Sequence, residues 1–168
     1  LTETVIDYLN NQIEAGADSV MIFDTWGGIL NKQSYEDFSL KYMTKIVEGI
    51  HRYYEDKTIP VTVFTKGGSA WLEQSVLSGC DAIGLGWTIE LGEAERRVGS
   101  QVALQGNLDP SVLCATSEVI VTEVNKVLDQ FKGETGHVFN LGHGITPDVN
   151  PDNMKVLVDA VHSYHKLK

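Results

Sequence analysis

Short apolar runs alternate with amphipathic segments along the whole chain, and this alternation predicts strands and helices in turn. The apolar runs lie at residues 19–23, 61–64, 81–85, 102–105 and 138–141. Each is bounded by glycine or polar turn residues, as is typical of strands. Within each run the apolar residues are continuous rather than alternating, which favours parallel strands covered on both faces by helical crossovers.

Segments with apolar residues at helical spacing fall before, between and after these runs. They cover residues 2–15, 34–54, 70–77, 90–97, 118–131 and 151–164. In the longest of them, the expected buried stripe consists of Phe38, Tyr42, Ile46, Ile50 and Tyr53. Strand and helix alternate about five times, so the sequence predicts an α/β fold built from successive βα units.

Composition and charge narrow the class of protein. The 168 residues correspond to about one domain, and 13 Lys and Arg against 23 Asp and Glu give a net charge of -10. This acidity argues against nucleic acid and anionic membrane surfaces as partners. No apolar run approaches the roughly 18 residues of a membrane span. Cys80 and Cys114 stand in no metal or redox spacing, so we expect two core thiols in a cytoplasmic protein.

Ligands in parallel α/β folds meet the carboxyl ends of the strands, so the residues after each run are the candidates for a binding site. They include Asp24, Thr25, Asn107, Asp109 and His143. Each has a structural alternative, because Asp and Asn side chains often satisfy backbone donors in turns. For His143, which lies between two glycines, a structural role and a ligand contact both stay open. The residues alone name no reaction and no metal site.

Four motifs in order resemble the uroporphyrinogen decarboxylase family. They are FDTWGGIL at 23–30, GLGWT at 84–88, LQGNLDP at 104–110 and NLGHGI at 140–145, and the resemblance covers essentially the whole chain. It implies a (β/α)8 TIM barrel and a cytoplasmic homodimer. It also implies removal of four acetate carboxylates from uroporphyrinogen, a tetrapyrrole, to give coproporphyrinogen without metal or organic cofactor. By position, Thr25 matches a substrate-contacting Ser/Thr, and His143 matches a histidine that contacts a substrate carboxylate.

The chain also departs from the pattern of this family. The arginine-rich amino-terminal motif, the aspartate that binds the pyrrole N–H groups and the substrate-contacting tyrosine are all absent. Five predicted strands fall short of the eight that close a barrel. We therefore expect residues 1–168 to be the carboxy-terminal part of one barrel domain, with the catalytic residues in the missing part and no activity in isolation. At the strand ends only Lys66 is basic, so the rest of the cationic site should lie in the missing part as well.

Two alternatives remain beside this interpretation. A zinc- and corrinoid-linked methyltransferase of the same superfamily would need a His-x-Cys pair at a strand end, but residues 63–67 read Val-Phe-Thr-Lys-Gly. A non-catalytic α/β assembly fragment is the other, because five open βα units leave two unpaired strand edges.

Overall fold

A parallel sheet of five strands forms the centre of the computed structural model, which describes residues 1–133 and 135–165. Its order is β1-β4-β5-β6-β7, so strands that follow one another in the chain also pair in the sheet. The strands are β1 (Val20–Asp24), β4 (Val61–Thr65), β5 (Ala82–Gly84), β6 (Ala103–Leu108) and β7 (His137–Leu141). The five predicted strands and their parallel pairing are confirmed.

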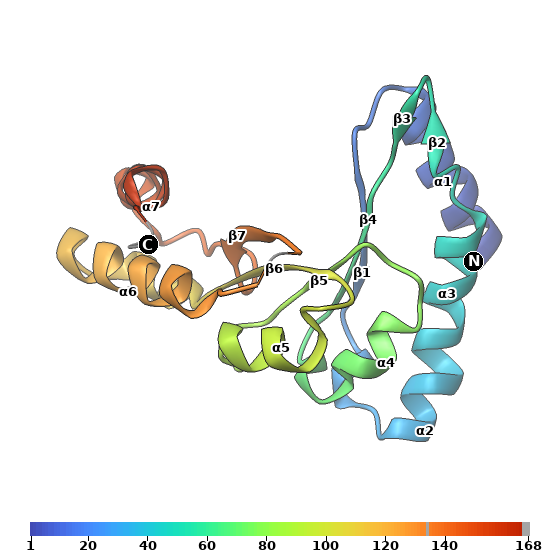
Figure 1. The fold of residues 1–168 in the computed structure, drawn as a ribbon, viewed down its shortest axis with the longest axis horizontal. Helices are drawn as coiled ribbons and strands as arrows, with labels where there is room; N and C mark the ends of the chain where they lie inside the picture. Colours follow the sequence, from blue (N-terminus) through green and yellow to red (C-terminus); the bar gives the residue numbers. More distant parts are fainter. Residues whose placement is uncertain (134, 166–168) are drawn as a thin grey trace.

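Helices connect the strands and pack against one side of the sheet. Their bounds are α1 (Thr2–Glu14), α2 (Lys32–Tyr35), α3 (Lys41–Gly49), α4 (Leu72–Val76), α5 (Leu91–Val98), α6 (Ser117–Gln130) and α7 (Pro151–Ser163). Figure 1 shows α1 and α3 together beside β1 and β4, and α6 and α7 together at the opposite end of the sheet. Asn150 caps α7 by accepting from the Asp152 N–H at 3.0 Å, directly before Pro151. No helix within the described ranges has the length and apolar character needed to cross a membrane.

The expected long helix over residues 34–54 is wrong. It is interrupted by a π-helical turn at Glu36–Leu40, and α3 ends at Gly49. Tyr53–Tyr54 (β2) then pairs with Lys57–Thr58 (β3) in a short hairpin. A π turn holds more residues than an α turn, so it rotates the two parts of the segment relative to each other. As a result Phe38 is 72% exposed, while Tyr35 is fully buried.

The two faces of the sheet differ in burial. Val20 and Ile22 of β1 face the helices and belong to the main core. Strand register places a single row of residues on the other face, namely Phe23, Phe64, Gly84, Gln105 and Val138. Phe23 is 68% and Val138 52% exposed, so the expectation of strands covered on both faces is wrong for β1 and β7. An open face across the sheet is therefore available to other groups.

The cysteines also lie in two different environments. Cys80 is buried before β5, where its Sγ lies 3.8 Å from the Ser75 carbonyl oxygen, and burial raises the pKa of the Cys80 thiol. Cys114 is exposed, which corrects the expectation of two core thiols. The reason is local: the 3-10 helix Pro110–Cys114 turns Leu113 into the core and leaves its last residue outside.

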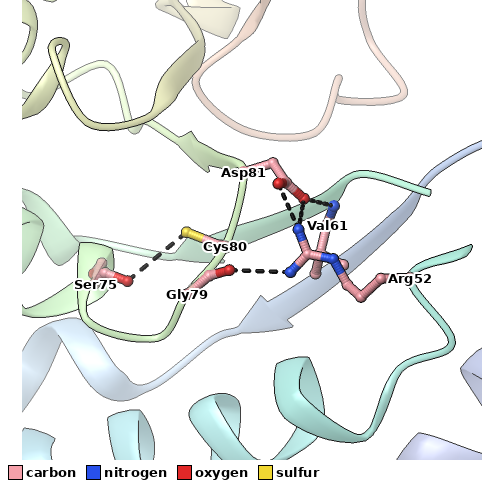
Figure 2. Close-up of polar contacts among 6 residues, drawn as sticks. All are labelled: Arg52, Val61, Ser75, Gly79, Cys80 and Asp81. Atoms are coloured by element: carbon pink, nitrogen blue, oxygen red, sulfur yellow. Dashed lines mark hydrogen bonds and ion pairs between the residues drawn. The ribbon is translucent and has the colours of Figure 1, made fainter. Parts of the chain in front are cut away.

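A charged clamp holds the amino ends of β4 and β5 together (Figure 2). Arg52, which precedes β2, contacts both carboxylate oxygens of Asp81 and donates to the Gly79 carbonyl oxygen at 3.1 Å. The Asp81 carboxylate also accepts from the Val61 N–H, the first of β4, at 2.7 Å. This end of the sheet lies opposite the ligand-binding end, so the clamp serves stability.

We expect Asp81→Asn to lower the free energy of unfolding by about 1 kcal/mol, because it weakens a partly exposed charge-assisted contact and leaves Arg52 without its counter-charge. Asp18→Asn is the matched control, since it removes the fully exposed ion pair with Lys57 and should change stability much less. Urea denaturation followed by circular dichroism measures both. Equal effects of the two substitutions would contradict a special role for the clamp.

Candidate functional site

A cavity of about 320 Å³ opens at the carboxyl ends of the strands, on the open face of the sheet. Its floor is apolar and includes Met21, Phe23, Phe64, Leu85 and Leu141. Its polar lining residues are Asp24, Thr25, Lys66, Gln105, Asn140 and His143. The rings of Phe23 and Phe64 meet edge to face, with centroids 5.8 Å apart. An apolar floor with a few polar groups above it, at this volume, is typical of a small-molecule site.

The floor depends on a glycine at its centre. A Cβ atom at Gly84 would lie 2.9 Å from Cδ2 of Phe64 and 3.2 Å from Cε of Met21. Any larger residue in β5 would therefore displace the side chains that form the floor. The sheet can hold two large side chains from neighbouring strands here because the third strand contributes none.

Thr25 and His143 follow the two edge strands of the sheet, β1 and β7, and line the same cavity. Both are exposed, so their polar atoms are accessible to a ligand. The Trp87 ring meets the His143 ring edge to face at 6.1 Å. A Cβ atom at Gly142 would lie 2.4 Å from the Trp87 nitrogen, which shows how closely the loop after β7 packs on the loop after β5. The β7 loop is thereby positioned against its neighbour.

Asp24 lines the cavity too, but its carboxylate is occupied within the protein. It accepts from the Gly27 N–H at 3.0 Å, from the Ser39 hydroxyl at 2.5 Å and from the Thr65 hydroxyl at 3.4 Å. A further contact from the Trp26 N–H measures 3.3 Å. These contacts match the structural alternative for Asp24, in which the carboxylate shapes the turn after β1.

The hydrogen bonds of Asp24 continue into the interior. The Tyr35 hydroxyl lies 3.3 Å from Oγ1 of Thr65 and 3.0 Å from Oγ of Ser75. Burial raises the pKa of the Tyr35 phenol, which therefore stays neutral and acts as a hydrogen-bonding link. This chain of contacts joins the ends of β1 and β4 to α2 and α4, and so fixes one wall of the cavity.

The other two candidates, Asn107 and Asp109, lie at the same edge of the sheet but do not line the cavity. Asn107 is 5% exposed, and its amide donates to the carbonyl oxygens of Gly86 at 3.0 Å and Ile89 at 2.6 Å. Asp109 accepts from the Ser111 N–H at 2.8 Å and caps the 3-10 helix that follows. Both side chains hold the loops around the cavity in place.

The cavity also contains residues that inspection of the strand ends missed. Met21, Phe23, Gln105 and Asn140 lie within strands rather than after them. The sequence does contain a signal for some of these residues, because side chains alternate between the two faces of a strand. Counting back in steps of two from Thr25 gives Phe23 and Met21, but assigning the same face on the other strands requires the register.

No group of three or more His, Cys, Asp or Glu in residues 1–133 and 135–165 is arranged to hold a metal ion.

Comparison with known proteins gives one consistent family. The family model described as Uroporphyrinogen decarboxylase (URO-D) matches residues 1–164. A uroporphyrinogen decarboxylase from Ruthia magnifica subsp. Calyptogena magnifica is 68% identical over 166 residues, which is 99% of this chain and 48% of that protein. One from Tolumonas auensis is 58% identical over 164 residues, or 98% of this chain and 46% of that protein. The chain thus spans about half the length of the curated relatives it matches.

A solved structure shares the fold. A methyltransferase from Methanosarcina mazei superposes with a TM-score of 0.80 at 22% identity, over 96% of this chain and 46% of that one. At this identity the likeness concerns the fold alone and says nothing of the reaction. The family match and the relatives agree with the four motifs at residues 23–30, 84–88, 104–110 and 140–145. The chain belongs to the uroporphyrinogen decarboxylase family.

Proposed function

We propose that this chain forms part of the substrate site of a uroporphyrinogen decarboxylase, a carboxy-lyase that converts the four acetate side chains of uroporphyrinogen to methyl groups. The observation that carries the proposal is the cavity, which has an apolar floor and is lined by Thr25 and His143 from the loops after the two edge strands. This floor suits the face of a pyrrole ring, and the polar groups suit its carboxylate side chains. The identity of 68% with a relative of that name supports the same substrate class.

In this reaction, protein groups have two tasks: to hold the substrate and to stabilise charge. A pyrrole carbon is protonated, and the cationic ring accepts the electron pair of the breaking carbon–carbon bond as carbon dioxide leaves. A proton then adds to the exocyclic CH2 carbon and the ring proton is lost, which gives the methyl group and restores the pyrrole. The protein must hold the macrocycle and stabilise charge where it develops. We assign the task of holding the macrocycle to Thr25 and His143, since both are accessible in the cavity. The carboxylate of Asp24, by contrast, is already hydrogen-bonded within the protein, at the turn after β1.

Residues 1–168 are, in this proposal, the carboxy-terminal part of a single barrel domain in a cytoplasmic homodimer. The support is that the relatives are about twice as long as the matched segment, and that five strands leave one face of the sheet open. The proton donor and the pyrrole anchor would then belong to the other part of the barrel.

The isolated chain should not convert uroporphyrinogen, because the proton donor and pyrrole anchor are not in it. Purified chain incubated with uroporphyrinogen under anaerobic conditions, with products separated by chromatography, tests this expectation. If coproporphyrinogen accumulates above the level of a heat-treated control, the proposal that the proton donor and pyrrole anchor lie in the other part of the barrel is wrong.

A chimera tests the activity itself. In the Ruthia magnifica relative, the segment matched by this chain is replaced with the corresponding residues of this chain, and the remaining half is kept. We expect the chimera to release coproporphyrinogen within about tenfold of the rate of the relative, since a tenfold loss corresponds to only about 1.4 kcal/mol of transition-state stabilisation. A folded chimera without decarboxylation would contradict the proposed function.

Removing the two positioning side chains should weaken binding of the substrate. In the chimera, Thr25→Val and His143→Ala should each lower kcat/KM by about tenfold, because each removes a polar contact to a charged substrate group. His162→Ala, an exposed histidine on α7 away from the cavity, is the control and should leave the kinetics unchanged. If His143→Ala behaves like His162→Ala, His143 has no part in binding.

A further inference from the structure

Among residues 1–133 and 135–165, Lys66 is the one Lys or Arg that lines the cavity. It follows β4 directly, is exposed, and forms no ion pair with any residue in the described ranges. All three arginines, by contrast, are paired with carboxylates elsewhere on the molecule. An unpaired ammonium beside an apolar floor is available for a negatively charged ligand group.

The nearest acidic cavity residue does not neutralise this charge. The Asp24 carboxylate faces the turn after β1, where backbone N–H groups and the hydroxyls of Ser39 and Thr65 satisfy it. Asp24 contacts Lys66 only through the backbone, with its carbonyl oxygen accepting from the Lys66 N–H at 2.9 Å. The side chains of the two residues form no ion pair, although their main chains are hydrogen-bonded.

The backbone of Lys66 is held firmly. Gly67 has a φ of 69°, which glycine adopts without strain. A Cβ atom at Gly28 would lie 2.0 Å from the Lys66 carbonyl oxygen, so the turn after β1 packs directly on this loop. A fixed base with a flexible four-carbon side chain lets the ammonium group reach ligand atoms over a short range while it stays at the cavity.

We propose that Lys66 binds a carboxylate side chain of the substrate and so helps the site to select polycarboxylated tetrapyrroles. This inference rests on the proposed function and adds a third residue to Thr25 and His143 in holding the substrate. The net charge of these 168 residues is -10, so a local cation at the cavity offsets the repulsion between this chain and a polyanion. A lysine ammonium, as a compact point charge, can bind a carboxylate that approaches from several angles, whereas the planar guanidinium of arginine favours one bidentate geometry.

The test uses the chimera described above and three variants of it. Lys66→Met removes the charge and keeps the length of the side chain, and Lys66→Arg keeps the charge. Lys45→Met is the matched control, an exposed lysine on α3 that lines no part of the cavity. We expect Lys66→Met to raise KM about fivefold to tenfold with little change in kcat, and to flatten the dependence of KM on salt concentration. Lys66→Arg should recover most of the loss, and Lys45→Met should match the parent chimera.

Binding of coproporphyrin, the fluorescent oxidised form of the product, is measured on the same proteins by fluorescence titration. This readout separates the two proposals. If the parent chimera shows no decarboxylation, the proposed function fails, and the ratio of coproporphyrin affinities between parent and Lys66→Met still decides the role of Lys66. An active parent with equal KM, equal affinity and equal salt dependence in Lys66→Met would overturn the role of Lys66 alone. A loss that Lys66→Arg does not recover would also overturn it, because it would point to packing rather than charge.

Discussion

Parallel hydrogen bonding between β1, β4, β5, β6 and β7 is the constraint on which the site depends. In register, this pairing brings every carboxyl end to the same edge of the sheet and lines up Phe23, Phe64 and Gly84 on one face. The rings of Phe23 and Phe64 meet on this face, and Gly84 on the next strand leaves room for the side chains of Phe64 and Met21. Residues more than a hundred positions apart in the chain, such as Thr25 and His143, reach the same cavity through the same pairing.

The polar side chains around the sheet fall into two sets: those hydrogen-bonded within the protein and those exposed in the cavity. Asp24, Asn107 and Asp109 form hydrogen bonds that hold the loops, in the case of Asp24 with the Ser39 and Thr65 hydroxyls as well as with backbone N–H groups. The Arg52–Asp81 clamp holds the amino ends of the strands in the same way. Thr25, His143 and Lys66 line the cavity and remain exposed. A site that must hold a charged ligand gains from this division, because loops already satisfied internally need little reorganisation when the ligand binds.

Sequence patterns predicted the five strands well because each is a short apolar run with a clear boundary. They failed over residues 34–54, where the π turn at Glu36–Leu40 breaks the helical period and a hairpin takes the end of the segment. They also failed for the exposed face of β1 and β7, since an apolar run looks the same whether one or both of its faces are covered. Inspection of strand ends found Thr25 and His143, but it did not find Gln105 or Asn140, whose inward direction depends on register.

By itself, the sequence determined the α/β class, the order of its units and, through four motifs, the family. These properties are local or additive, because apolar periodicity and short motifs do not depend on what packs against them. Only the tertiary structure decided which polar side chains are free. Asp24 ends β1 and Lys66 directly follows β4, so both lie at the carboxyl ends of neighbouring strands. The Asp24 carboxylate is nevertheless hydrogen-bonded by the turn beside it, whereas the Lys66 ammonium forms no ion pair within the described ranges. Hydrogen bonds between segments far apart in the chain make that distinction, as the contacts of Asp24 with Ser39 and Thr65 show.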